Sequence, residues 1–139
     1  MNGGIILRKA TYFAVFEPSS TGYSVYFPDF PGCISCGDDM EHAIKMAKEA
    51  LGLHYWGMEK DGYEMPEPTY PPYADMESGD FTIPVEIFPD IVKGIIEGKA
   101  VKKTLTIPYW LNVQAEAAEV NFSQVLQSAL KEYLSIAEA

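Results

Sequence analysis

The last third of the chain constrains its fold most, because residues 102–134 read as a short strand followed by two amphipathic helices. The strand is KKTLTIP, and the helices are YWLNVQAEAAEVN and FSQVLQSALKEYL. A segment of this length is too short to bury a core of its own, so its stability would require a second copy. Two paired copies of the strand would form a ribbon of the right width for the DNA major groove. The segment therefore predicts a dimeric DNA-binding module.

Alternation along the strand predicts which of its side chains would face DNA. If Leu105 and Ile107 point into the dimer core, then Lys102, Thr104 and Thr106 point the other way. Threonine offers a hydroxyl for hydrogen bonds and a methyl for a thymine contact, while lysine can reach a guanine or a phosphate. The ribbon contains no arginine, so we expect modest affinity per dimer and help from several half-sites. The candidate DNA-binding residues of the ribbon are Lys102, Lys103, Thr104 and Thr106.

The two helices of this segment are marked by their ends and by their apolar stripes. Pro108 suits the first turn of the first helix, and Asn121 tolerates the left-handed conformation of a tight turn. Ser123 is predicted as the N-cap of the second helix, where backbone amides could hold a DNA phosphate, and is the fifth candidate DNA-binding residue. The second helix carries apolar residues at spacings of three and four: Phe122, Val125, Leu126, Ala129, Leu130 and Tyr133.

The net charge of the chain is unevenly distributed. The formal charge is -10, yet residues 99–139 hold four lysines and four glutamates, so all the excess acid lies upstream. A neutral tail can touch phosphate while an acidic body meets a basic partner protein. The sequence shows neither a run of about 20 apolar residues nor a signal peptide in MNGGIILRKA, and we expect a folded cytoplasmic protein.

The upstream part reads as strands and one long helix, which makes the fold class α+β. Aromatic and β-branched residues over 11–16 and 23–27 flank a turn-rich stretch and predict a β-hairpin. Residues 33–36 predict a third short strand, and residues 81–88 a fourth, which Pro84 places at a sheet edge or at a bulge. Residues 65–73 hold too many prolines for a helix, and residues 89–100, with two glycines, predict a connection that ends near Lys99.

A helix is predicted to follow the third strand. Asp38 would be its N-cap, with Glu41 completing a capping box, and the helix would fray near residues 57–62. One face of the helix carries apolar residues suited to packing on the sheet: Met40, Ala43, Ile44, Ala47, Ala50, Leu51 and His54.

Several of these segments together resemble one protein family. YFPDFPGCISCG at 26–37, DDMEHAIKMAKEAL at 38–51 and GYEMPEP at 62–68 resemble the signature of the HicB antitoxins. Residues 103–134, with PYWLN and NFSQVLQSAL, resemble the ribbon-helix-helix tail that many HicB proteins carry. Each motif is moderately specific, and their order and spacing are much more so. The resemblance covers nearly the whole chain.

This resemblance implies two functions, one for each part of the chain. Residues 1–98 would form a degraded RNase H-like domain, an antiparallel sheet with one main helix, that binds and neutralises a HicA-type mRNA endoribonuclease toxin. Residues 99–139 would form a ribbon-helix-helix domain that dimerises and binds operator DNA, so that the protein represses its own operon. The partners would be a HicA-type toxin, operator DNA and further copies of the chain, as a homodimer or a higher oligomer. No catalytic residue, metal or cofactor is expected.

Other interpretations of the same residues stay open. The tail could serve dimerisation alone, and the chain could be a freestanding ribbon-helix-helix repressor whose first domain senses a small ligand. A surviving metal-dependent RNase would need carboxylates on neighbouring strands, and the interior of residues 11–16 has none. Cys33 and Cys36 form a C-x-x-C, but His42 and His54 would lie about 18 Å apart along one helix and could not complete one zinc site.

Overall fold

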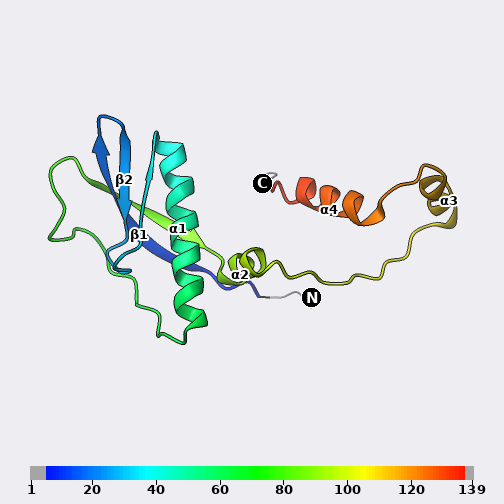
Figure 1. Ribbon diagram of the computed structural model, residues 1–139, viewed down its shortest axis with the longest axis horizontal. Helices are drawn as coiled ribbons and strands as arrows, with labels where there is room; N and C mark the ends of the chain where they lie inside the picture. Colours follow the sequence, from blue (N-terminus) through cyan, green and yellow to red (C-terminus); the bar gives the residue numbers. More distant parts are fainter. Residues whose placement is uncertain (1–5, 137–139) are drawn as a thin grey trace. The chain divides into compact units, whose positions relative to one another are not determined.

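The chain folds as two compact units, Met1–Ala100 and Val101–Ala139. A computed structural model describes residues 6–136 (Figure 1). The N-terminal unit contains the strands β1 (Ala10–Ser19), β2 (Gly22–Tyr26), β3 (Ile34–Gly37) and β4 (Phe81–Ile87) and the helices α1 (Met40–Lys60) and α2 (Pro89–Glu97). The C-terminal unit contains α3 (Tyr109–Ala117) and α4 (Phe122–Tyr133). No helix among the described residues is long and apolar enough to cross a membrane.

The four strands form one antiparallel sheet in the order β3-β2-β1-β4. The predicted hairpin is confirmed, with Val15 opposite Tyr26 and Ser19 opposite Gly22. The placement of Pro84 is also confirmed, because β4 pairs with β1 and lies at an edge of the sheet. An edge strand tolerates proline because one side of its backbone needs no ladder partner. The fold is α+β, as expected.

The core of the N-terminal unit lies between the sheet and α1. Along β1 the alternate residues Tyr12, Ala14 and Phe16 are buried on the helix side. The Tyr12 ring meets the edge of Phe30 with centroids 4.5 Å apart. The remaining fully or nearly buried residues of this cluster are Val25, Phe27, Cys33, Ala43, Ala47, Leu51, Tyr55, Val85 and Ile87. Burial of so many apolar side chains is what stabilises this unit without help from the rest of the chain.

Helix α1 differs from its prediction at both ends. Its N-cap is Asp39 rather than Asp38, and the Asp39 carboxylate accepts a hydrogen bond from the His42 amide at 2.8 Å. Either aspartate satisfies the sequence pattern of a cap, and the backbone turns into the helix one residue later than expected. The helix also continues through Gly57 to Lys60 instead of fraying there. Tyr55, one turn before its end, is in the core, and this burial stabilises the last turns.

The predicted connection over residues 89–100 is wrong in part, because most of it is helix α2. Pro89 begins this helix, a position where its missing N–H costs nothing, and Gly98 ends it with a left-handed φ of 63°. Helix α2 packs on α1 at Gly52, where an added Cβ would lie 3.3 Å from both methyl groups of Val92. Gly94 inside the helix lowers its helix propensity, and packing on α1 overrides that deficit.

Arg8 ties three segments of the N-terminal unit together. Its guanidinium donates to both carboxylate oxygens of Glu59 in α1, at 2.9 and 3.2 Å, and to both of Asp90 in α2, at 2.9 and 3.1 Å. This geometry lowers the pKa of Asp90, since the hydrogen bonds from Arg8 favour the charged carboxylate. The bidentate pairing fixes the segment before β1 against the two helices.

The C-terminal unit begins with an irregular segment over residues 101–108, followed by α3 and α4. The predicted strand is not formed within one chain, because a strand requires a hydrogen-bonded neighbour and this unit contains only one copy of the segment. Pairing of this segment between two copies stays a prediction. Neither α3 nor α4 has a buried residue.

Two details of the C-terminal unit correct the sequence predictions. Asn121, not Ser123, is the N-cap of α4, and its side chain accepts from the Gln124 amide at 3.1 Å. Asn121 has φ of -82°, whereas Glu119 takes the left-handed conformation with φ of 54°. Pro108 is the residue just before α3 rather than within its first turn. The turn between the helices therefore begins two residues earlier than expected, and this places Asn121 at the helix start.

Candidate functional site

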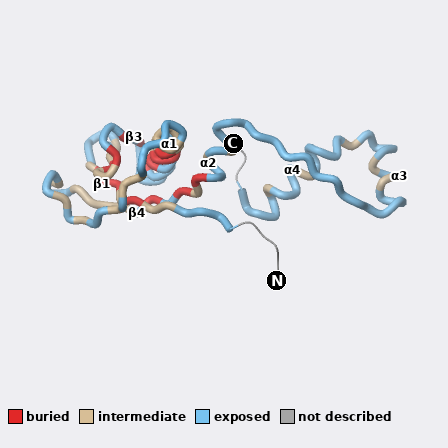
Figure 2. The backbone as a smooth tube through the Cα atoms, turned by 90° about the horizontal axis from the view of Figure 1, so that it is seen from below, coloured by how far each residue is buried: buried red, intermediate tan, exposed pale blue. Residues whose placement is uncertain are grey.

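The apolar side chains of the C-terminal unit are exposed in the single chain. In Figure 2 nearly all of this unit has the pale blue colour of exposed residues. Leu105 is 63% exposed and Trp110 62%. The other large exposed apolar residues of the unit are Val101, Ile107, Tyr109, Leu111, Val113, Phe122, Val125, Leu130, Tyr133, Leu134 and Ile136. So many exposed apolar side chains in a unit of this length are typical of a protein interface, since apolar surface is costly to leave in water.

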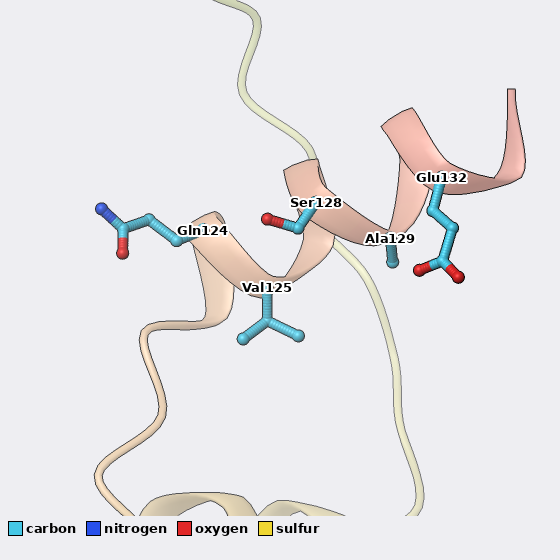
Figure 3. A pocket seen from close by; sticks show the side chains of 5 residues that line it. All are labelled: Gln124, Val125, Ser128, Ala129 and Glu132. Carbon is cyan, nitrogen blue, oxygen red and sulfur yellow. The ribbon is translucent and has the colours of Figure 1, made fainter. Parts of the chain in front are cut away.

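Helix α4 presents one face on which another helix could pack. Val125 and Ala129 point to the same side of α4, with Glu132 following one turn later (Figure 3). They belong to a shallow groove that is also lined by Gln124 and Ser128. An apolar row with a spacing of four residues is the kind of ridge that packs into the groove of a neighbouring helix. The face is therefore suited to contact with a second copy.

The structure places the five candidate DNA-binding residues in two segments. Lys102, Lys103, Thr104 and Thr106 are exposed and share the irregular segment before α3. Ser123 is the second residue of α4, and its hydroxyl accepts from the Gln127 side chain at 3.0 Å. Its role as a cap is thus taken by Asn121, and a phosphate contact by the amides near Ser123 stays a prediction.

A second candidate surface lies on the face of the sheet that α1 does not cover. Residues directly opposite in an antiparallel sheet share a face, so Val15, Tyr26 and Ile34 point the same way from β1, β2 and β3. Ile34 is 71% exposed. We call this side of the sheet the outer face. Carboxylates gather around it: Glu17, Asp75, Glu77 and Asp80 all raise the pKa of Tyr26, after the larger effect of its burial.

The loop between α1 and β4 runs along the outer face and supplies three of those carboxylates. It passes on the side of the sheet away from α1 (Figure 1), and its Tyr70 ring packs on Phe13 of β1 with centroids 5.3 Å apart. Asp29 accepts from both the amide and the hydroxyl of Thr69, the amide at 3.0 Å, and the Tyr73 hydroxyl donates to the Thr69 carbonyl at 2.6 Å. These bonds hold the loop in one arrangement.

The outer face contains functional candidates that sequence reasoning did not name. Glu17 and Tyr26 come from the hairpin, and the other carboxylates come from about 50 residues further along the chain. A local signal did exist, because residues 61–80 contain six carboxylates and no lysine or arginine. The register that brings this loop onto the sheet could not be predicted from that composition.

The contacts of the histidines and cysteines are of the kind that stabilise a fold. His42 Nδ1 accepts from the Asp38 amide at 3.1 Å, and the His54 ring packs on Phe30. No group of three or more metal-ligating side chains is found within residues 6–136. Cys33 is buried in the core and Cys36 is exposed, and both are free thiols. The two cysteines of the C-x-x-C motif thus lie in different environments.

The two cysteines are expected to differ in reactivity towards a disulfide reagent. Burial raises the pKa of the Cys33 thiol to about 11, so at neutral pH it stays protonated and shielded. Titration of the native protein with Ellman's reagent should label Cys36 rapidly and Cys33 only after unfolding in guanidinium chloride. Cys36→Ser provides the control, because it should abolish the rapid phase. Two rapid thiols in the native protein would contradict the burial of Cys33.

Comparison with known proteins identifies relatives over most of the chain. The chain is 36% identical over 99 residues to an uncharacterized 14.9 kDa protein of Haemophilus phage HP1, covering 70% of this chain and 72% of that protein. It is 38% identical over 62 residues to antitoxin HicB 2 of Photorhabdus laumondii, covering 45% of each. This second match thus spans less than half of the antitoxin's length.

A solved structure and a family profile extend these matches. A chain of a toxin-antitoxin complex from Streptococcus pneumoniae is 26% identical, with a TM-score of 0.54 over 91% of this chain and 99% of that chain. The profile of the HicB-like antitoxins of bacterial toxin-antitoxin systems matches residues 12–130. That span extends into both units. The chain belongs to the family of HicB-like antitoxins, which are not enzymes.

Proposed function

We propose that the chain binds and neutralises a HicA-type mRNA endoribonuclease toxin with residues 1–98, and binds operator DNA as a dimer with residues 99–139 to repress its own operon. In this proposal the first part is a degraded RNase H-like domain and the second a ribbon-helix-helix domain. The observation that carries it is the contrast between the two units. The first has a complete core and the excess of acid, and the second has no buried residue in its helices.

Neutralisation is supported by family membership and by charge. The pneumococcal relative is described as part of a toxin-antitoxin complex. A ribonuclease must bind a polyanion, so its RNA-binding surface needs cationic groups. Residues 1–98 carry 16 carboxylates against 6 lysines and arginines. Opposite charges of this kind accelerate association and select the correct partner.

Operator binding is supported by the exposed C-terminal unit. If two copies pair their segments 102–107, Leu105 and Ile107 become buried between the helices, and Thr104 and Thr106 project from the ribbon. Pairing would thus bury the apolar side chains that one chain leaves exposed. The same pairing would generate the surface that enters the major groove.

Co-expression with the small basic reading frame beside the gene tests the proposed function. An affinity tag on this chain should retain the neighbouring protein through gel filtration, as a complex whose mass contains at least two copies of this chain. Purification of the tagged chain alone, with the neighbour expressed and folded, would contradict neutralisation by binding. A complex with one copy of this chain would contradict the dimer.

Base recognition by the ribbon gives a separate prediction. Thr104→Ala together with Thr106→Ala should relax base preference, because the hydroxyl and methyl contacts to base edges are lost. The thermal midpoint of the dimer should change little, because both side chains would face outwards. Mobility shifts with operator and mutated operator duplexes measure the first effect, and thermal denaturation the second. A large fall in melting temperature would assign the threonines to packing.

A further inference from the structure

Helix α2 exposes an apolar face on a side that α1 does not cover. Val92 of this helix packs on Gly52 of α1, whereas Ile91 is 46% exposed and Ile95 75%. Residues at spacings of three and four share one side of a helix, and four residues of this spacing include the two exposed isoleucines. They are Ile91, Gly94, Ile95 and Gly98, and we call them the α2 face. The α2 face carries no charge, and none of its residues is buried.

The two glycines leave open space between the isoleucines of the α2 face. A Cβ added at Gly94 or Gly98 would meet no described heavy atom within 4 Å. Glycine inside a helix lowers its stability, and no contact of the described residues requires glycine at position 94. A missing side chain does allow the backbone of another helix to approach closely. The α2 face is thus shaped for a second helix whose side chains fill the space over the glycines.

The α2 face is complementary to itself. If two α2 helices pack antiparallel with Ile95 against Gly94 of a second copy, the same register places Ile91 against Gly98 of that copy. Each isoleucine then fills the space over a glycine, in both directions. Such a pair has a twofold axis, which is the commonest symmetry of protein dimers.

Charge favours a second copy as the occupant of this face. Residues 1–98 carry 16 carboxylates against 6 lysines and arginines, so two copies repel each other over most of their surface. Both carboxylates of α2 are paired within their own chain, Asp90 with Arg8 at 2.9 Å and Glu97 with Lys99 at 3.2 Å. Two acidic units can therefore meet here without strong repulsion. An uncharged face gives a cationic protein or a nucleic acid no electrostatic advantage.

The chain that follows α2 keeps two copies of the face close together. Four residues separate Glu97 from Lys102, where the segment proposed to pair between copies begins (Figure 1). These five Cα–Cα steps span at most about 18 Å. In a ribbon with Lys102 opposite Ile107, the two Lys102 residues lie about 17 Å apart along the strands. Antiparallel α2 helices place their Glu97 ends about 12 Å apart, so both contacts can form in one dimer.

We propose that the α2 face packs against the α2 face of a second copy, antiparallel, within the dimer that the C-terminal units form. This rests on the proposed function, which supplies that dimer. A helix of nine residues buries far less than the roughly 1,000 Å² of a stable interface, so the contact forms only where the ribbon already holds two copies. Residues 1–98 alone therefore stay monomeric. The contact fixes the arrangement of the two N-terminal units in one dimer.

Disulfide trapping in the full chain tests the contact. Ile95→Cys in a Cys36→Ser background should form a covalent dimer on mild oxidation with copper phenanthroline, because the antiparallel pair brings the two new thiols close to the twofold axis. The matched control is Ile34→Cys in the same background, since Ile34 of β3 is exposed to a similar extent, 71% against 75%. On non-reducing gels Ile95→Cys should cross-link at least about tenfold faster than the control.

Substitutions at the α2 face test its contribution to the dimer. Ile95→Ser should raise the dissociation constant of the full-chain dimer at least about tenfold, measured by sedimentation velocity over a dilution series, because both copies lose a buried apolar side chain. Gly94→Ala should also weaken the dimer, although alanine favours the helix itself and should not lower the melting temperature. The controls are Ile34→Ser and Gly57→Ala, the second being another open glycine inside a helix. Both controls should dissociate within about twofold of the unmodified chain.

Three results would contradict this proposal in different ways. Equal cross-linking rates for the two cysteine variants, or an unchanged dissociation constant for Ile95→Ser, would overturn the α2 contact and leave the C-terminal dimer intact. Weaker binding of the neighbouring basic protein by Ile95→Ser, with self-association unchanged, would overturn it in favour of a toxin-binding face. A full chain that is monomeric at every concentration would overturn the dimer of the proposed function together with the contact.

Discussion

Removal of residues 99–139 is expected to abolish operator binding while leaving toxin binding within about twofold. Among the described residues, the hydrophobic core cluster lies within residues 12–87, so the truncated chain retains what stabilises its fold. The lost segment contains every residue of the proposed ribbon and both helices that would pair between copies. DNA binding requires two copies, because one ribbon strand cannot occupy the groove alone. Mobility shift with operator DNA and surface plasmon resonance with the toxin measure the two activities.

The truncation is also expected to lower the number of copies in the assembly, and hence its mass in solution. Sedimentation equilibrium should give a dimer or higher oligomer for the full chain and a monomer for residues 1–98. A milder variant, Leu126→Asp, places a charge in the apolar stripe of α4 and should have the same effect on assembly and DNA binding. Operator binding that survives either change would contradict the assignment of DNA binding to the C-terminal unit.

Gly37→Ala is expected to destabilise the N-terminal unit by about 3 kcal/mol or more, in the upper range for overpacked sites. Gly37 ends β3 where α1 begins, and a Cβ there would lie 2.3 Å from the Ala43 nitrogen and 2.4 Å from its Cα. Both atoms belong to the backbone of a core helix, so neither can rotate away. Thermal denaturation should show a fall in the midpoint of more than about 10 °C, given about 4–8 °C per kcal/mol for a domain of this size.

Gly57→Ala is the matched control for this substitution. Gly57 lies inside α1, and a Cβ added there meets no heavy atom within 4 Å. Alanine in a helix interior should stabilise the protein by about 0.4–1 kcal/mol, mainly by restricting the unfolded chain. Equal melting temperatures for Gly37→Ala and the unmodified chain would show that β3 and α1 can separate without loss of packing.

Local patterns in the sequence predict most of the N-terminal fold. Alternation identified the hairpin, and Pro84 identified an edge strand, because both signals depend on neighbouring residues alone. Helix α2 was not predicted, because Gly94 and Gly98 indicated an irregular connection and the helix-start signal of Pro89 was given less weight. The apolar residues Ile91, Val92, Ile95 and Ile96 follow helical spacing and could have revealed it. The cap of α1 was displaced by one residue because Asp38 and Asp39 fit the same pattern.

The candidate surfaces were predictable to different extents. The exposed ribbon segment is continuous in sequence, so alternation alone selects Thr104 and Thr106. The outer face joins Glu17 and Tyr26 of the hairpin to Asp75 of a distant loop. Tertiary contacts such as that of Tyr70 with Phe13 and those of Thr69 with Asp29 bring these segments together. Composition can indicate that such a loop is acidic, but it cannot show which face of the sheet the loop follows.

Inhibition of RNA cleavage tests the central claim most directly. The neighbouring basic protein is purified free of this chain and given a labelled mRNA fragment, with increasing amounts of the full chain added. Cleavage should fall to background once the chain is equimolar with the toxin subunits that it binds, and residues 1–98 alone should have the same effect. Cleavage that continues undiminished at a large excess of the full chain would contradict the central claim.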